Sequence, residues 1–171
     1  MAARVRRIEP GEGPRLRDVR LRALGDTPSA FASSLGLEAT RPPTAWDEDA
    51  LVRSEGWTAA TFIVEDDGTW LGLVGAYRRA DRTGVVELVS MWVDPVARRD
   101  GLGARLAAEV LEWAEAGGAQ RVELWVATGN ERAMSLYRRL GFASASDRQA
   151  LPSDPCRDEV RMFLSLAPGD A

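Results

Sequence analysis

Arginines and glycines around a single turn are the residues of this 171-residue chain whose types and spacing favour the binding of phosphate. An apolar run leads into the basic turn ARRDGLGA, which contains Arg98, Gly101 and Gly103. Glycines carry no Cβ, so the backbone can approach a bulky anion closely. The helix expected to open at about Gly103 presents free N–H groups, which favour negative charge together with the helix dipole. The segment therefore predicts a phosphate-binding turn.

Three kinds of phosphate-binding loop compete for this segment. A Walker loop requires Gly-Lys-Ser/Thr, and no lysine follows these glycines. A dinucleotide-binding fingerprint requires a third glycine at the position of Leu106. The pattern R/Q-x-x-G-x-G/A is met in full by Arg98, Gly101 and Gly103. The third kind of loop therefore fits best.

Through this loop the chain resembles the GCN5-related N-acetyltransferases, a superfamily that binds acetyl-CoA in this way. A second segment fits the family pattern N-x-x-A-x-x-L-Y-x-x-x-G-F at Asn130, Ala133, Leu136, Tyr137, Gly141 and Phe142. Upstream, VVELVSMWV matches the strand that the family places before its loop. The motifs stand in the expected order, and the resemblance covers roughly residues 58–166. It implies the acyl-CoA N-acyltransferase fold, an α+β domain with a mixed, mostly antiparallel central sheet flanked by helices.

The resemblance also implies a binding site for acetyl-CoA as the acyl donor. Backbone groups of Met91 and Val93 would bond pantetheine as an added strand, and N–H groups from Arg99 to Ala104 would bond the pyrophosphate. An acidic Asp100 beside a diphosphate lowers the affinity unless its side chain points to solvent or pairs with an arginine. The donor-binding residues implied in this way are Met91, Trp92, Val93, Arg98, Arg99, Asp100, Gly101, Leu102, Gly103, Ala104 and Asn130.

Tyr137 aligns with the family tyrosine that protonates the leaving thiolate. A phenol has an unperturbed pKa of about 10, close to that of an alkyl thiol, so proton transfer between them is nearly thermoneutral. The alternative is a core aromatic residue at helical spacing. Asn130 lies two turns earlier on the same helix face. It would contact pantetheine, cap the helix, or do both.

Glu87 is the candidate general base, at the offset from the loop where the histone-type enzymes carry a base glutamate. An acceptor ammonium with a pKa of about 10 must lose a proton before its nitrogen can attack. Strand alternation places Glu87 on the face of Met91 and Val93, and the alternative role is that of a solvated or salt-bridged carboxylate. Phe31 and Trp125 are candidates to line the acceptor pocket, with simple packing as the alternative.

Composition limits the chemistry and the partners. The chain has no histidine, which removes imidazole bases, Ser-His and Cys-His pairs and His-ligated zinc, so we expect no metal. A net charge of −4 with both signs scattered argues against nucleic acid. Apolar stretches are too short for a membrane span, and the N-terminal segment has no apolar signal region. The single Cys156 fits a reducing compartment, so we expect a cytoplasmic protein.

The hydrophobic pattern predicts one domain over residues 1–171. The family resemblance implies that residues 25–56 lie on the acceptor side and that residues 85–142 form the acetyl-CoA-binding core. The expected strands are Val5–Ile8, Thr58–Glu65, Trp70–Tyr77, Val85–Val93, Arg121–Val126, Phe142–Ser146 and Glu159–Leu166. The expected helices are Glu12–Leu24, Ser29–Leu37, Ala45–Ser54, Gly103–Ala116 and Asn130–Leu140. Leu151–Asp158 is expected to be a loop, and Ala167–Ala171 a loose tail.

The activity implied by the resemblance is that of an acyltransferase that moves an acetyl group from acetyl-CoA to a primary amine, by direct attack in a ternary complex. The expected acceptor is a small molecule such as an antibiotic or an amino acid. One alternative is a protein or peptide N-acetyltransferase. Another is a non-catalytic acyl-CoA-binding module, which keeps the loop but needs no working acid. The oligomeric state stays open, with a homodimer as one option because dimers are frequent in the superfamily.

Overall fold

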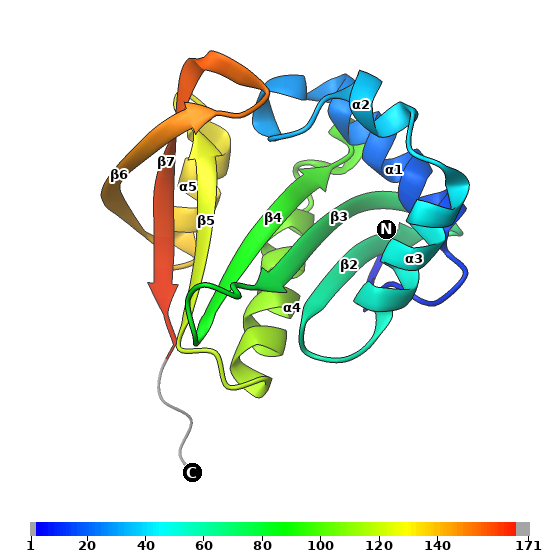
Figure 1. The fold of residues 1–171 in the computed structure, drawn as a ribbon, viewed down its shortest axis with the longest axis horizontal. Helices are drawn as coiled ribbons and strands as arrows, with labels where there is room; N and C mark the ends of the chain where they lie inside the picture. The colour runs from blue at the N-terminus through cyan, green and yellow to red at the C-terminus, as the bar shows by residue number, and fades with distance from the viewer. Residues whose placement is uncertain (1–2, 167–171) are drawn as a thin grey trace.

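The computed structural model describes residues 3–166, whose strands form one seven-stranded sheet (Figure 1). The strands are β1 Arg4–Arg7, β2 Ala59–Asp66, β3 Thr69–Arg78, β4 Val85–Val93, β5 Arg121–Ala127, β6 Ala143–Leu151 and β7 Asp154–Ser165. The helices are α1 Gly13–Asp26, α2 Leu35–Ala39, α3 Pro43–Ser54, α4 Leu102–Ala116 and α5 Glu131–Arg139, with short 3₁₀ turns at Pro28–Ala30 (η1) and Pro95–Ala97 (η2). The expected tail Ala167–Ala171 lies outside the described residues.

The sheet has the strand order β1-β2-β3-β4-β5-β7-β6, and every neighbouring pair is antiparallel except β4 and β5. This confirms the mixed, mostly antiparallel α+β architecture expected from the sequence. The parallel pairing is short, because it joins only Val85–Glu87 to Arg121–Glu123. Beyond these residues β4 and β5 diverge (Figure 1). The sheet therefore opens between two of its central strands.

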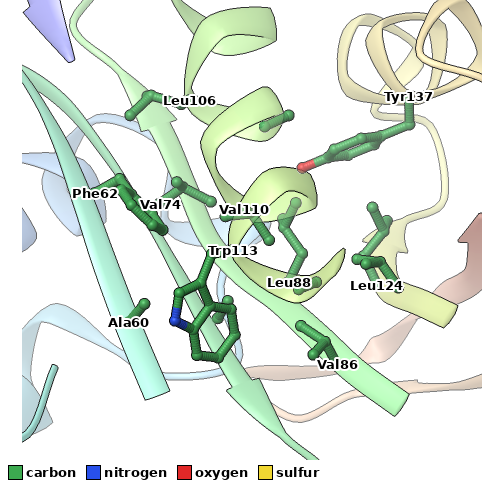
Figure 2. Close-up of a cluster of buried hydrophobic side chains, with 14 of the residues drawn as sticks. Ala60, Phe62, Val74, Val86, Leu88, Leu106, Val110, Trp113, Leu124 and Tyr137 are labelled. Carbon is green, nitrogen blue, oxygen red and sulfur yellow. The ribbon is translucent and has the colours of Figure 1, made fainter. Parts of the chain in front are cut away.

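The helices cover both faces of the sheet. On one face, Leu106, Val110 and Trp113 of α4 are buried in a core cluster that also contains Phe62 and Leu88 of the strands (Figure 2). Each of these large apolar side chains stabilises the fold by about 1.5–3 kcal/mol through burial. On the other face, apolar side chains of α1 and α3 pack against those strand side chains that point away from the α4 core, including Ile63 of β2, Leu73 of β3 and Trp92 of β4. The core thus fixes β4 from both sides, up to the residues that precede the glycine-rich turn.

Two segments differ from the sequence-based expectation. A single helix over Ser29–Leu37 is wrong: η1 ends at Ala30, Phe31 is extended and buried, and Ser34 caps the separate helix α2 by accepting a hydrogen bond from the Leu37 N–H at 3.3 Å. The expected loop Leu151–Asp158 is also wrong, because β6 and β7 form a hairpin with Leu151 opposite Asp154. The side chains of this hairpin are mostly exposed and polar, so no hydrophobic alternation revealed it.

An ion-paired carboxylate beside β1 gives a pH-dependent prediction. Glu65 accepts hydrogen bonds from Arg15 at 2.5 Å and from Arg6 at 3.1 Å, and these hydrogen bonds hold its pKa below the ordinary value. A lowered pKa stabilises the folded state above the unfolded pKa, and this contribution disappears as the pH falls through the folded value. We therefore expect Glu65→Gln to lower the free energy of unfolding by about 1 kcal/mol at neutral pH. Urea denaturation should show that difference vanish in strong acid.

The matched control is Glu48→Gln, which neutralises an exposed carboxylate elsewhere on the surface. This substitution should change the free energy of unfolding by no more than about 0.5 kcal/mol, both at neutral pH and in strong acid. A Glu65→Gln effect that persists undiminished in strong acid would contradict the assignment to the ion pairs.

Candidate functional site

The turn after β4 presents unpaired backbone donors. The Asp94 carboxylate accepts a hydrogen bond from the Val96 N–H at 3.1 Å and shapes η2, and Gly101 adopts a left-handed conformation with φ of 73° at the start of α4. Within residues 3–166, no protein group accepts a hydrogen bond from the N–H groups of Gly101, Leu102 or Gly103. These donors stand at the positive end of a 15-residue helix, which is a favourable place for an anion.

Gly101 and Gly103 line a cavity of about 400 Å³ at the meeting point of β4, α4 and α5. It brings together segments that lie far apart in the sequence. Its walls are formed by Thr27, Ala30, Phe31, Met91, Trp92, Val93, Arg98, Gly101, Gly103, Ala104, Asn130, Arg132, Ala133, Leu136, Arg139 and Leu140. Apolar walls with a few convergent polar groups are typical of small-molecule sites.

Gly103 is placed where a side chain would intrude. A Cβ at this position would lie 3.2 Å from Leu136 Cδ2 and 3.9 Å from Val93 Cγ2. The glycine therefore allows α4 and α5 to approach while its own N–H stays accessible. Leu102 is 2 % exposed and belongs to the core, so its side chain anchors the turn.

Most of the donor-binding residues inferred from the sequence line this cavity, and three do not. Arg99 and Asp100 are exposed, and Leu102 points into the core. The exposure of Asp100 matters because its carboxylate is hydrated rather than held against the bare N–H groups. The acidic residue therefore need not repel an anion bound at the turn.

Arg98 is held by protein groups on the acceptor side of the cavity. Its Nε–H donates to the Val93 carbonyl at 2.9 Å, and its guanidinium is ion-paired with Asp26. Asp26 also accepts a hydrogen bond from Trp92 Nε1 at 2.9 Å. Although burial alone would raise the pKa of the Asp26 carboxyl, hydrogen bonds from Thr27, Trp92 and Arg98 hold it below its ordinary value. Arg98 thus links the glycine-rich turn after β4 to the end of α1.

Two further arginines, Arg132 and Arg139, line the cavity, and the sequence analysis missed them. Arg132 Nη2 donates to the Arg98 carbonyl at 2.8 Å, and Arg139 Nη1 donates to Ser135 Oγ at 2.8 Å. The two arginines stand two turns apart on α5, so their shared helix face is the signal that could have identified them. Both arginines add positive charge to the part of the cavity wall that α5 forms.

Asn130 caps a helix and also lies in the cavity wall. Its Oδ1 accepts a hydrogen bond from the Ala133 N–H at 3.2 Å and caps α5, and the residue also lines the cavity. The amide NH₂ is a donor that the cap leaves unused.

Tyr137 lies in the core rather than in the wall of the cavity. It is 4 % exposed and packs edge-on against Phe142 with ring centroids 5.6 Å apart. Burial raises the pKa of Tyr137 above its ordinary value. Figure 2 shows its hydroxyl directed toward Val110 and Leu88. Leu88 directly follows Glu87, the last residue of β4 that pairs with β5, so the hydroxyl lies at the inner end of the opening in the sheet.

Glu87 is 9 % exposed and forms an ion pair with Arg79 at 2.7 Å. It lies opposite Tyr77 on β3 and Glu123 on β5. Burial, followed by the charge of Glu87, raises the pKa of Tyr77 to about 12. The carboxylate is therefore salt-bridged, which was the alternative role considered from the sequence. It lies on the sheet face opposite the α4 core, whereas Met91 and Val93 pack against that core, so the expected shared face is wrong. Simple strand alternation is broken at Ser90, which has a positive φ of 59°.

The two aromatic residues expected at the acceptor pocket have different surroundings. Phe31 is buried in the cavity wall, and its carbonyl accepts a hydrogen bond from Ser153 Oγ in the β6–β7 turn. Trp125 is half-buried on β5 opposite Arg161, outside the cavity. Cys156 is exposed on β7 instead of lying in a loop.

Among residues 3–166 we find no group of three or more His, Cys, Asp or Glu side chains placed to hold a metal ion. Within the same residues no helix combines the length and apolar character needed to cross a membrane.

Comparisons with known proteins give several relatives. A 30% identity over 132 residues relates the chain to a mycothiol acetyltransferase of Beutenbergia cavernae, covering 72% of this chain and 44% of that protein. An uncharacterized N-acetyltransferase of Methanocaldococcus jannaschii is 34% identical over 85 residues, covering 47% of this chain and 38% of the relative. The chain thus spans less than half the length of either relative. A [ribosomal protein bS18]-alanine N-acetyltransferase of Salmonella typhimurium is 28% identical over 121 residues, covering 66% of this chain and 82% of that protein.

Solved structures share the fold. An acetyltransferase of the GNAT family from Streptococcus pneumoniae superposes with a TM-score of 0.80 at 23% identity, covering 96% of this chain and 99% of that one. The yncA acetyltransferase of Salmonella typhimurium, solved with acetyl-CoA, has a TM-score of 0.77 at 18% identity, covering 100% of this chain and 98% of that one. The family model described as "Acetyltransferase (GNAT) family" matches residues 31–142. Since this match extends over more than half of the sequence, the chain belongs to the GNAT acetyltransferase family.

Proposed function

We propose that this protein is an acetyl-CoA-dependent N-acetyltransferase that acts in the cytoplasm on a primary amine of a small molecule. One observation carries the proposal. Gly101 and Gly103, whose N–H groups are unpaired, line an apolar cavity beside the stretch of β4 that β5 leaves unpaired. A diphosphate suits the amides, and an extended amide-bearing arm suits a free strand edge. Acetyl-CoA combines the two.

The chain offers binding groups for each part of the donor. Backbone groups of Met91 and Val93 would bond the pantetheine amides, and the turn would hold the pyrophosphate with help from Arg98, Arg132 and Arg139. Arg98 already neutralises Asp26, so the amides and the α5 arginines would supply most of the attraction. Asn130 would donate its free amide hydrogens to the pantetheine arm.

The reaction is a direct transfer in which acetyl-CoA supplies the activated thioester. The amine nitrogen attacks the acetyl carbon, a C–N bond forms, and the C–S bond breaks. Glu87 would take the proton of the acceptor ammonium, directly or through water. Tyr137 would donate its proton to the departing sulfur, because its hydroxyl lies at the inner end of the opening between β4 and β5. The second proton of the attacking amine would then leave the new amide nitrogen and restore the Tyr137 hydroxyl, directly or through water.

Segment 25–56 would form the acceptor side of the site, because Thr27, Ala30 and Phe31 of this segment line the cavity. The names of relatives cover two acceptor classes: mycothiol acetyltransferase names a small molecule, and the bS18-alanine enzyme names a protein. We favour a small acceptor, since Ser153 of the β6–β7 turn bonds the Phe31 carbonyl and ties this turn to the acceptor side of the cavity.

Two measurements test the proposal. Calorimetry should detect acetyl-CoA binding with a dissociation constant of roughly 1 mM or tighter, in the range of ordinary Michaelis constants. A thiol-release assay should then show turnover with at least one of a panel of amines, amino acids and peptides. Binding without turnover on every acceptor would support the acyl-CoA-binding module instead. Absence of binding to folded protein would overturn the donor assignment itself.

The role of Glu87 can be tested by its pH dependence. We expect Glu87→Gln to lower kcat/KM by roughly 100-fold at neutral pH, where the acceptor amine is almost entirely protonated. The deficit should shrink as the pH approaches the amine pKa of about 10, because the acceptor then loses its proton without a base.

The control for this substitution is Asp81→Asn, which removes the other carboxylate that pairs with Arg79 but leaves Glu87 in place. Its pH–rate profile should match that of the wild type. A Glu87→Gln deficit of the same size at every pH would point to a structural ion pair and against a base.

A further inference from the structure

A second, smaller pocket lies under α1, α2 and α3, on the sheet face opposite the α4 core. Its volume is about 100 Å³, enough for a carboxylate and the carbon atoms next to it. Its polar lining includes Arg20, Arg41, Arg53, Trp46 and Ser90. The proposed donor and catalytic roles use none of these residues.

Trp46 provides an unsatisfied buried donor. The residue is 2 % exposed, and within residues 3–166 its Nε1 has no hydrogen-bond partner. An indole N–H can only donate, and leaving such a donor buried and unpaired costs about 1–3 kcal/mol. The guanidinium of Arg41 lies 4.2 Å from the centroid of the Trp46 ring and fixes its orientation. The pocket is therefore lined by a residue whose buried donor has no acceptor atom.

The charged groups of the pocket are unbalanced. Glu38 pairs with Arg41 at 3.3 Å and reaches Arg20 only at 3.6 Å. Asp49 pairs with Arg41 at 2.7 Å and reaches Arg53 only at 3.8 Å. The pocket thus contains two carboxylates and three guanidinium groups, and the shortest ion pair of each carboxylate is with Arg41. Arg20 and Arg53 retain donor capacity that an anion could use.

Arg20 is the most buried of the three arginines, with 13 % of its side chain exposed. Burial lowers the pKa of its guanidinium, and repulsion from Arg53 and Arg41 adds to this effect while Glu38 opposes it. Its Nη1 donates to Ser90 Oγ at 3.1 Å. A bound anion would replace lost hydration and offset the repulsion between the arginines.

The pocket adjoins the large cavity through two residues. Arg20 lies 4.8 Å from the centroid of the Phe31 ring, and Phe31 lines the cavity. Ser90 lines the small pocket, has a positive φ of 59°, and directly precedes Met91 in the cavity wall. A ligand anchored in the small pocket can therefore direct its other end toward the unpaired part of β4.

We propose that this pocket binds the carboxylate of the acceptor, so that the substrate is a small amine that also carries a carboxylate group, such as an amino acid. The inference rests on the proposed N-acetyltransferase function and narrows its substrate class. Arg20, Arg53 and the Trp46 N–H would each donate to the carboxylate oxygens, while the amine faces the acetyl group. An anchored carboxylate would also fix the distance between amine and thioester.

The first test compares matched acceptors in the thiol-release assay. The twenty common amino acids are assayed beside their methyl esters and the amines that lack the carboxyl group. We expect at least one free amino acid to be acetylated, with kcat/KM at least roughly 100-fold above that of its ester and its decarboxylated amine, because those analogues leave buried donors unpaired. Equal rates for all three members of each set would overturn the inference while leaving the acetyltransferase function intact.

The second test measures binding without turnover. The indole N–H resonance of Trp46, assigned by its loss in Trp46→Phe, is followed by NMR while amino acids, or the corresponding amines, are added with and without CoA. Carboxylate binding should shift this resonance, and the amines should not. If no amino acid shifts it, the inference is wrong even when the protein binds acetyl-CoA. A shift without any acetyl-CoA binding would support the pocket and overturn the proposed function.

Variants separate binding from folding. Arg53→Gln removes one charged donor from a side chain that is 32 % exposed, so the fold should survive. We expect it to raise KM for the preferred amino acid about 10- to 100-fold with little change in kcat or in KM for acetyl-CoA, and Arg53→Lys should restore part of the loss. The control is Arg15→Gln on α1. Arg15 pairs with Glu65 and does not line the pocket, so this substitution should change neither kcat nor the KM for the amino acid. An unchanged KM in Arg53→Gln would contradict the carboxylate site.

Discussion

Tyr137→Phe is expected to lower kcat about 100-fold while the dissociation constant of acetyl-CoA changes by less than about twofold, as removal of a general acid requires. The substitution deletes one oxygen from a buried ring and keeps the contact with Phe142. Rapid measurement of thiol release at saturating substrates, together with calorimetry for acetyl-CoA, separates the two quantities. The burial of Tyr137 makes this test informative, since a packing residue would lose stability and retain its turnover.

The pH–rate profile adds a second expectation for the same residue. Because burial raises the pKa of Tyr137 above its ordinary value, the hydroxyl stays protonated throughout the neutral and mildly alkaline range. The rate should therefore not fall between pH 7 and about 10 through loss of this proton. A control, Phe142→Leu, disturbs the packing of the ring and should affect the melting temperature more than kcat. If Tyr137→Phe turns over at the wild-type rate, the tyrosine is a core residue only.

Gly103→Val is expected to weaken acetyl-CoA binding by roughly 100-fold, because two charge-assisted hydrogen bonds at the turn would be lost or lengthened. The new Cβ would lie 3.2 Å from Leu136 Cδ2, so the valine must displace α5 or the turn. Either displacement moves the N–H groups of Leu102 and Gly103 away from the position of the diphosphate. Calorimetry with acetyl-CoA and with CoA measures the loss directly.

Glu115→Val is the matched control, because it introduces the same β-branched side chain on the exposed part of α4. Its own effect on helix stability should be a loss of at most roughly 0.5 kcal/mol, and its affinity for acetyl-CoA should equal that of the wild type. Wild-type affinity in a folded Gly103→Val protein would mean that the diphosphate does not bind at this turn.

The parts of the site that could be predicted are those that depend on residues close together in the sequence. The turn around Gly101 and the cap at Asn130 depend on backbone conformation and on contacts within a few residues, which a motif records directly. The pairing of Arg98 with Asp26 was not predictable, because it joins residues 72 apart that only the tertiary fold brings together. The same is true of Arg20 and Ser90, which come from α1 and β4 and are 70 residues apart.

The two errors in the fold have a common physical origin. Segments with few apolar side chains give no periodic signal, so Leu151–Asp158, at the polar end of the β6–β7 hairpin, was predicted to be a loop and the Phe31 region a helix. In the hairpin, backbone pairing between β6 and β7 supplies the order. At Phe31, burial of a single ring in the cavity wall outweighs the weak helical preference of its neighbours.

The short parallel pairing of β4 and β5 has a consequence for the protein without its donor. Beyond Glu87 the β5-facing edge of β4 is a strand edge inside the sheet rather than at its margin. Pantetheine would complete the missing ladder, and a ligand present at about 100 times its dissociation constant would then stabilise the native state by about 2.7 kcal/mol. The amide hydrogens of Met91 and Val93 should accordingly exchange with deuterium readily in the free protein and slowly once acetyl-CoA is added.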